Sequence, residues 1–243
     1  MIPLQLLKNG ASKLGIELTD AQLRQFETFA IMLLAANRNF NLTRITDPQE
    51  IVTKHFLDSL MCLSAEQVAN GAYAIDIGTG PGFPGIPIKI ARPDVHITLI
   101  DGTAKKIRFV SEVVSRLGLD GVSTIHCRAE ELGRDRAHRE RYEVAYARAL
   151  SKMRVLVELC LPFVRVGGVL VATKGPTAGS EIDEAQSLID ELGGTIHNIC
   201  CTQIPETDIN RVIIVIRKVS ATPDRYPRPY AQIVGSRKTG SRS

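Results

Sequence analysis

The feature that most constrains this chain is a glycine- and proline-dense segment that directly follows a short apolar run. Residues 72–77 read as a buried strand with Asp76 near its end, and the chain continues Gly78-Thr79-Gly80-Pro81-Gly82-Phe83-Pro84-Gly85. Glycine tolerates positive φ and lets a ligand approach the backbone closely. The N–H groups of such a turn, and of a helix that follows it, can bind polar groups. The segment therefore predicts a ligand-binding strand–turn–helix unit.

Further apolar runs of strand length occur at intervals along the chain, at 95–100, 122–126, 142–147 and 167–173, with helical patterns between them. Strands that alternate with helices at this pace predict βαβ units and a parallel sheet. Two last runs, 194–203 and 211–217, are separated by a connection too short for a helix. We therefore expect an α/β fold with a Rossmann-like, mostly parallel sheet closed by an antiparallel C-terminal hairpin.

The first 70 residues have a different pattern, with helical periodicity at 4–14, 20–38 and roughly 48–60. In the third helix the apolar positions leave Lys54 and Asp58 off the expected buried face. The sequence thus predicts an N-terminal helical extension over 1–70, a ligand-binding core over 71–219 and a tail over 220–243. The tail, expected to be flexible, is basic and rich in Pro, Gly and Ser, which favours either phosphate affinity or a solubilising role.

Composition excludes several classes of protein. Five cysteines without a C-x-x-C pair, and five scattered histidines, predict neither a disulfide framework nor a metal site. No uncharged apolar run approaches the ~20 residues that span a bilayer, and the N-terminus lacks the pattern of a signal peptide. We expect a cytoplasmic protein without a membrane partner.

The glycine turn can be aligned to two kinds of adenosine cofactor. Gly80-x-Gly82-x-x-Gly85 matches the dinucleotide fingerprint, a weak signal alone. Asp76-x-Gly78-x-Gly80-x-Gly82 follows the strand directly and is typical of S-adenosylmethionine sites, where the acid can meet the amino-acid end of the cofactor. Asp101, at the end of the second strand, can accept hydrogen bonds from ribose hydroxyls in either case. Glu130, after the third strand, is either an acceptor for the adenine edge or a solvated acid.

Several motifs together resemble one family. The segment Asp76-Ile77-Gly78-Thr79-Gly80-Pro81-Gly82-Phe83-Pro84-Gly85-Ile86-Pro87 is similar to the signature of the bacterial glucose-inhibited division protein B family, also called ribosomal RNA small subunit methyltransferase G. Further similar motifs are Asn39-Phe40-Asn41-Leu42-Thr43, His55-Phe56-Leu57-Asp58-Ser59, Lys105-Lys106-Ile107-Arg108-Phe109 and Ala147-Arg148-Ala149, and the resemblance extends from about residue 20 to Pro229.

The resemblance implies the class I methyltransferase fold and N7 methylation of one guanine in the decoding-region loop of small-subunit (16S) rRNA. The cofactor would be S-adenosylmethionine and the product S-adenosylhomocysteine. It also implies cofactor contacts at Gly78, Phe83, Asp101, Gly102, Thr103, Ala129, Glu130 and Arg148, to which the glycine frame adds Asp76, Gly80 and Gly82.

The chemistry of the chain agrees with this acceptor. After the fourth strand the sequence reads Tyr146-Ala147-Arg148-Ala149-Leu150-Ser151, without the Asn/Asp-Pro-Pro-Tyr/Phe element of amino-group methyltransferases. A Pro-Cys nucleophile for C5-cytosine chemistry is also missing. Guanine N7 has a free lone pair and needs positioning rather than a base. We expect Arg148 to orient the target or the cofactor, the alternative being an ordinary surface ion pair.

We expect a cationic rim that contacts RNA, although any one of its members could be a solvated charge. Its residues are Arg38, Arg44, Lys54, Lys105, Lys106, Arg108 and Arg128. The run Arg134-x-Arg136-x-x-Arg139-x-Arg141 reads as a solvated face. The expected partner is small-subunit rRNA, as naked RNA or within the subunit, with no obligate protein partner. The alternatives are a methyltransferase for another RNA or a small molecule, an NAD-dependent oxidoreductase, and a non-catalytic RNA-binding scaffold.

Overall fold

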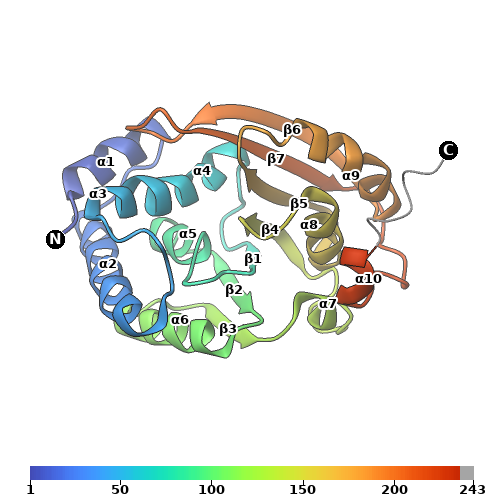
Figure 1. The fold of residues 1–243 in the computed structure, drawn as a ribbon, viewed down its shortest axis with the longest axis horizontal. Helices are drawn as coiled ribbons and strands as arrows, with labels where there is room; N and C mark the ends of the chain where they lie inside the picture. Colours follow the sequence, from blue (N-terminus) through green and yellow to red (C-terminus); the bar gives the residue numbers. More distant parts are fainter. Residues whose placement is uncertain (236–243) are drawn as a thin grey trace.

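The computed structural model describes residues 1–235, which form a twisted sheet of seven strands with helices on both faces (Figure 1). The strand order is β3-β2-β1-β4-β5-β7-β6. Strands β1 to β5 pair in parallel, and β7 is antiparallel to both β5 and β6. Their bounds are β1 Tyr73–Ile77, β2 His96–Asp101, β3 Val122–His126, β4 Tyr142–Arg148, β5 Val164–Lys174, β6 Gly194–Gln203 and β7 Asn210–Lys218. The Rossmann-like fold with a C-terminal hairpin is confirmed.

The helices divide between the two faces of this sheet (Figure 1). One face is covered by α1 Leu4–Lys13, α2 Asp20–Phe40, α3 Pro48–Glu50, the π-helix Ile51–Leu57, α4 Asp58–Ala65, α5 Gly85–Ala91 and α6 Ala104–Leu117. The other is covered by α7 Ala129–Leu132, α8 Met153–Cys160, the 3-10 helix Leu161–Phe163, α9 Gly179–Glu191 and α10 Tyr230–Gly235. Within residues 1–235, no helix is both long and apolar enough to cross a membrane.

Alternation along the strands builds a separate core on each face. In β1, Ala74 packs in the cluster that includes the N-terminal helices, whereas Ile75 and Ile77 pack in the cluster under α8 and α9. Phe26 and Phe56 from the N-terminal helices lie 4.9 Å apart between ring centroids, inside the first cluster. The N-terminal helices therefore share their core with the sheet rather than folding around one of their own.

The helix predicted over 48–60 contains a π-helical segment, and this changes which residues it buries. A π turn closes i→i+5 hydrogen bonds, so it holds an extra residue and rotates the following positions around the axis. Asp58, expected off the buried face, is only 3% exposed. That expectation is wrong, and Lys54 remains half-buried at the surface.

The C-terminal segment, residues 219–235, packs against the core instead of forming a flexible tail. Arg139 donates hydrogen bonds to the carbonyl oxygens of Thr222 and Tyr226, both at 2.7 Å. Arg134 donates to the carbonyl oxygen of Pro227 at 2.8 Å. Residues 220–235, predicted as part of a flexible tail, are thus held by side chains of the core. Of the predicted solvated face, Arg139 is half-buried beside this segment, whereas Arg134, Arg136 and Arg141 are exposed as predicted. The remainder of the predicted tail, with Arg237, Lys238 and Arg242, lies outside the described residues.

Candidate active site at the ends of the parallel strands

The glycine turn joins β1 to α5 and requires glycine for two physical reasons. Gly78, Gly80 and Gly82 have φ of 71°, 59° and 107°, in the left-handed region that side chains disfavour. At Gly85 the limit is space, because a Cβ would lie 2.2 Å from Leu99 Cδ2. This close approach seats the start of α5 directly on the sheet.

Asp76 organises this turn from inside the protein. Its side chain is fully buried, and Oδ2 accepts hydrogen bonds from the Thr79 hydroxyl at 2.6 Å and the Gly85 N–H at 2.9 Å. Burial raises the pKa of Asp76 to about 7, against the effect of these two hydrogen bonds. Oδ2 thus holds the turn from beneath, whereas Oδ1 is buried without a hydrogen-bond partner among the described residues, and the contact of Asp76 with the cofactor stays a prediction.

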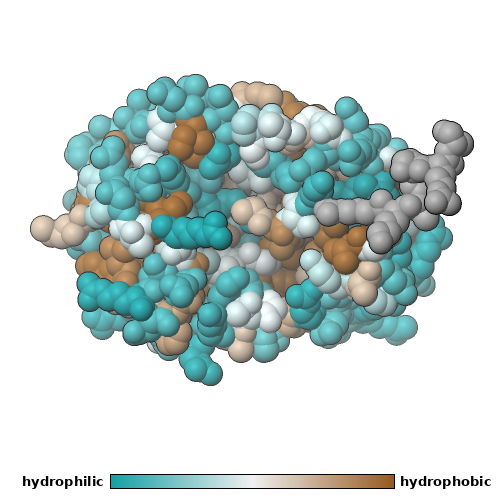
Figure 2. All heavy atoms as spheres, viewed as in Figure 1, coloured by the Kyte–Doolittle hydropathy of each residue, from teal (hydrophilic) through white to brown (hydrophobic). Residues whose placement is uncertain are grey.

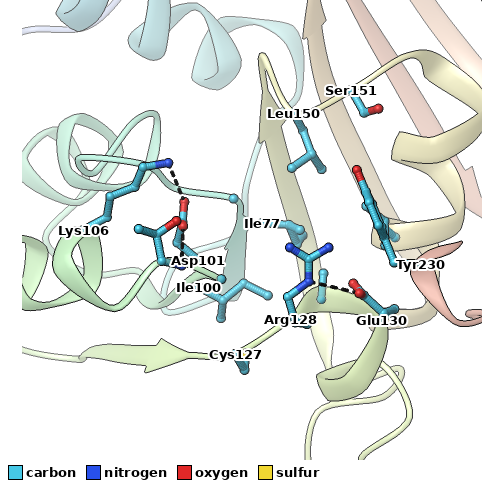
Figure 3. A pocket seen from close by; sticks show the side chains of 15 residues that line it. Ile77, Ile100, Asp101, Lys106, Cys127, Arg128, Glu130, Leu150, Ser151 and Tyr230 are labelled. Atoms are coloured by element: carbon cyan, nitrogen blue, oxygen red, sulfur yellow. Dashed lines mark hydrogen bonds and ion pairs between the residues drawn. The ribbon is translucent and has the colours of Figure 1, made fainter. Parts of the chain in front are cut away.

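A first cavity, of about 250 Å³, opens beside the turn at the ends of β1, β2 and β3 (Figure 3). Six residues predicted to contact the cofactor line it, namely Gly78, Asp101, Gly102, Thr103, Ala129 and Glu130. Lys106 and Arg128, predicted to contact RNA, also line it. The other lining residues were not predicted, and they include Leu150, Ser151 and Tyr230. The cavity lies at the carboxyl ends of parallel strands, where α/β proteins bind their ligands.

The polar groups of the first cavity suit an adenosine. Asp101 Oδ1 accepts a hydrogen bond from the Thr103 N–H at 2.8 Å, and Oδ2 accepts one from the Gly80 N–H at 3.0 Å. Lys106 Nζ lies 3.5 Å from the same Oδ2 (Figure 3). Ile77 and Leu150 also line the cavity, and Figure 3 shows the Arg128 guanidinium between the side chains of Asp101 and Glu130. The cavity therefore has a carboxylate at either end, one of which can accept from ribose hydroxyls and the other from an adenine amino group.

Gly80, Gly82 and Phe83, also predicted to bind the cofactor, lie inside the turn. The Gly82 N–H donates to the carbonyl oxygen of Thr79, and the Gly80 N–H is taken by Asp101. Phe83 is 3% exposed and stacks on His55, with ring centroids 4.3 Å apart. These residues shape the turn, and Phe83 links it to the N-terminal helices.

A second cavity, of about 420 Å³, lies on the other side of β4, and Arg148 opens into it rather than into the first. Basic residues from four separate segments line this cavity, together with the single carboxylate of Asp58; they are Lys54, Arg148, Lys174 and Arg211. Asp58 binds both guanidinium groups, at 2.8 Å from Arg148 Nη1 and 2.8 Å from Arg211 Nε. Lys54 also pairs with Glu50 at 2.5 Å and Lys174 with Glu181 at 2.7 Å, so the four basic side chains face three carboxylates and the cavity keeps a modest positive excess.

Arg148 is fixed by several contacts. Its Nη1 also donates to the carbonyl oxygen of Lys54 at 3.0 Å, and the guanidinium lies 5.1 Å above the Phe83 ring. Its Nη2 lies 3.3 Å from His55 Nδ1. Burial, and then the charge of Arg148, lower the pKa of His55 to about 3, so this histidine is neutral. Since the Arg148 side chain is only 12% exposed, the alternative of an ordinary surface ion pair is wrong.

The loop after β4 separates the two cavities. Arg148 and Ala149 line the second, and Leu150 and Ser151 line the first. Ala149 has φ of 53°, a left-handed conformation that a non-glycine residue adopts only when its surroundings impose it. The strand order also reverses direction between β1 and β4, which makes this loop the topological switch point of the sheet.

The structure separates the predicted RNA contacts into two groups. Arg38, Arg44, Lys105 and Arg108 are exposed around α2 and α6, and Lys105 Nζ donates to the carbonyl oxygen of Phe40 at 3.2 Å. The other three lie at the cavities, Lys106 and Arg128 at the first and Lys54 at the second. On the face shown in Figure 2 apolar side chains are visible around a hollow middle, and hydrophilic ones dominate the periphery. Residues 1–235 hold no cluster of three or more potential metal ligands.

Comparison with known proteins agrees with this geometry. Residues 22–210 match the family described as rRNA small subunit methyltransferase G, or GidB. The chain is 44% identical over 222 residues to the ribosomal RNA small subunit methyltransferase G of Desulforamulus reducens, covering 91% of this chain and 92% of the relative. It is 44% identical over 224 residues to that of Pelotomaculum thermopropionicum, covering 92% and 94%.

Among solved structures, M. jannaschii TYW2 in complex with AdoMet superposes with a TM-score of 0.55 at 13% identity, over 72% of this chain and 80% of that one. This likeness shows the fold alone. The family match confirms the resemblance found in the motifs and overturns the alternative of an NAD-dependent oxidoreductase. The chain belongs to the rRNA small subunit methyltransferase G family.

Proposed function

We propose that this protein, an S-adenosylmethionine-dependent rRNA methyltransferase by family, methylates N7 of one guanine in a loop of the 16S rRNA decoding region. One observation carries the proposal. A cavity with the carboxylates of Asp101 and Glu130 and a second cavity with an excess of basic side chains lie on either side of the loop Arg148–Ser151, at the switch point of the sheet. A methyl donor bound in the first cavity and a target nucleotide bound in the second would lie next to each other at that loop.

The first cavity would hold the cofactor. Asp101 accepts hydrogen bonds from the ribose hydroxyls, and the Ala129 N–H with the Glu130 carboxylate reads the adenine edge. Lys106, beside Asp101, balances the charge of that carboxylate. When bound, S-adenosylmethionine supplies an electrophilic methyl group on its sulfonium sulfur.

The second cavity would hold the target nucleotide. Lys54, Lys174 and Arg211 offer positive charge to its phosphate, and Arg148 offers the planar donor fork that suits a base edge or a phosphate. Guanine N7 has its lone pair free at neutral pH, so the residues need only align the base. The neutral His55 and the ion-paired Asp58 are consistent with an orienting role rather than proton transfer.

The exposed arginines and lysines would hold the surrounding RNA. Arg38, Arg44, Lys105 and Arg108 extend positive charge from the cavities along α2 and α6. The major groove of an A-form helix is too deep and narrow for side chains, so an enzyme that reaches N7 needs a loop or an extruded base. We propose a structured rRNA loop, presented by naked 16S rRNA or by the small subunit.

Strand scission tests the proposal directly. N7 methylation leaves the guanine cationic, so borohydride reduction followed by aniline cleaves the RNA there. Cells that carry the gene should show one strong scission site in the decoding region, absent from a deletion strain. The wild-type gene and an Arg165→Ala variant should restore it, because Arg165 pairs with Glu143 at an exposed site away from both cavities. Arg148→Ala should not.

Two results would contradict the proposal. An identical scission pattern in the deletion strain would make the assigned acceptor wrong. Full restoration of the scission site by Arg148→Ala would show that the second cavity takes no part in the reaction. Purified enzyme given naked 16S rRNA or intact small subunits, with radiolabelled cofactor, distinguishes the two forms of the substrate.

A further inference from the structure

The first cavity has one wall that comes from outside the part of the chain matched by the family model. Tyr230, the first residue of α10, lines the cavity together with Arg128 and Glu130, whereas the family match ends at residue 210. Figure 3 shows its ring facing the cavity from the side opposite Asp101. Tyr230 is 40% exposed, although the segment that carries it is packed against the core.

The C-terminal segment holds this ring in position by buried contacts. Glu158, which is fully buried in α8, accepts hydrogen bonds from the Arg228 N–H and Nε, both at 2.9 Å. Tyr226 and Ile233, on either side of Tyr230 in sequence, are 6% and 5% exposed. Tyr226 and Ile233 therefore anchor the segment in the core. Tyr230 lies at the edge of the cavity and contributes little to that core.

Arg128 connects Tyr230 to the residues that read the cofactor. Its guanidinium lies 4.6 Å from the centre of the Tyr230 ring, and its Nε donates to Glu130 Oε1 at 3.0 Å. A guanidinium between an aromatic face and a carboxylate is held by cation–π and ionic attraction at once. Tyr230, Arg128 and Glu130 therefore form a continuous wall at the end of the cavity that lies across from Asp101.

We infer that Tyr230 is a cofactor-binding residue, and that the C-terminal segment completes the adenosine end of the S-adenosylmethionine site. This inference rests on the proposed function. Tyr230 supplies an aromatic surface against the nucleoside, and Arg128 couples its position to Glu130. The activity thus depends on the C-terminal segment, although the composition of this segment is typical of a solvated tail.

Calorimetry on the full chain tests the inference, with S-adenosylhomocysteine and 5′-methylthioadenosine as probes. Both contain the adenosine, and only the first carries the amino-acid end. Tyr230→Ala should weaken the affinity for both probes about tenfold, since removal of an aromatic surface from a base costs about that much. Tyr230→Phe should stay within about twofold of wild type, because the ring remains. Tyr73→Ala, at another exposed tyrosine beside His96, should leave both affinities unchanged.

A purely structural role would give a different pattern. Tyr230→Ala should leave the melting temperature of the ligand-free protein close to wild type, because Tyr230 lies at the surface and outside the buried core. If this variant fails to fold, Tyr230→Leu replaces it, which keeps apolar volume and loses the aromatic face. Coupling is measured with Arg128→Met, whose effect on affinity should not multiply with that of Tyr230→Ala.

Three outcomes overturn the inference. They are unchanged affinity in folded Tyr230→Ala or Tyr230→Leu, a loss confined to S-adenosylhomocysteine, and effects of Arg128→Met and Tyr230→Ala that multiply independently. In each of these cases wild type still binds S-adenosylhomocysteine. Wild-type protein that binds neither probe would instead contradict the proposed function itself, so the two failures are distinguishable.

Discussion

Removal of Asp58 should destabilise the protein far more than removal of an exposed aspartate. Asp58 is 3% exposed and its two oxygens hold Arg148 and Arg211, whose side chains are 12% and 22% exposed. Asp58→Ala leaves two guanidinium groups in a cavity without their counter-charge. Breaking a buried ion pair in this way costs about 3–5 kcal/mol. Because Arg211 retains some contact with water, we expect the lower end, about 3 kcal/mol.

That cost is measurable as a shift in melting temperature and in urea denaturation. For a chain of this length, about 3 kcal/mol corresponds to a decrease of roughly 6–12 °C in the melting temperature. Asp94→Ala is the matched control, since Asp94 also pairs with an arginine, Arg92, at 2.7 Å but is 36% exposed. The control should cost about 1 kcal/mol or less. Asp58→Asn keeps the volume and removes the charge, and it should cost nearly as much as Asp58→Ala.

The same variants test the assignment of the cavities. Asp58 lines the second cavity and not the first, so Asp58→Asn should reduce methylation while leaving the affinity for S-adenosylhomocysteine nearly unchanged. A cost below about 1 kcal/mol for Asp58→Ala would refute the argument from burial. Wild-type stability in Asp58→Asn would show that shape, and not charge, holds the two arginines.

Three further predictions concern the cofactor, the RNA and pH. Asp101→Ala should weaken S-adenosylhomocysteine binding by ~1–3 kcal/mol, the cost of lost hydrogen bonds to a charged group. An unchanged affinity, measured by calorimetry, would show that Asp101 does not bind the cofactor. Lys105→Ala combined with Arg108→Ala should leave that affinity intact and make the salt dependence of RNA binding shallower by ~1–2 units; an identical slope would mean that both side chains are only solvated. Burial holds the pKa of His55 at about 3 in the folded protein against 6.5 when unfolded, so its contribution to stability is complete above pH 6.5 and is lost as pH falls toward 3. Urea denaturation between pH 7.5 and 5 should show wild type losing more stability than His55→Asn, and parallel curves would count against a buried neutral histidine.

The sheet and the first cavity were predictable because both depend on local patterns. Strand period, helix period and glycine spacing are read within short windows, and parallel strands bring their ends to one edge. Asp101 and Glu130 follow from that rule and line the first cavity as expected. For Asp76 the rule is insufficient, because an acid at a strand end can face either the ligand or its own turn. The close approach of Gly85 to the strand shows that Asp76 Oδ2 faces the turn.

The second cavity depends on contacts that no local pattern carries. Asp58 is turned inward by a π segment that helical periodicity does not anticipate, and Arg211 reaches it from β7, 153 residues later. Tyr230 was missed for a related reason. A segment rich in proline and arginine is typical of a tail, and its attachment here relies on Glu158 and on backbone carbonyls that accept from Arg134 and Arg139.

The loop Arg148–Ser151 has a thermodynamic consequence for an enzyme with two ligands. Its first two residues line the second cavity and its last two line the first, and Ala149 is held in a left-handed conformation, so a movement of the loop on one side also changes the other. If the ligand of the first cavity orders the loop, the second ligand loses less conformational entropy when it binds, and its affinity rises. By linkage the factor is reciprocal, so RNA should tighten the binding of cofactor by the same factor by which cofactor tightens the binding of RNA.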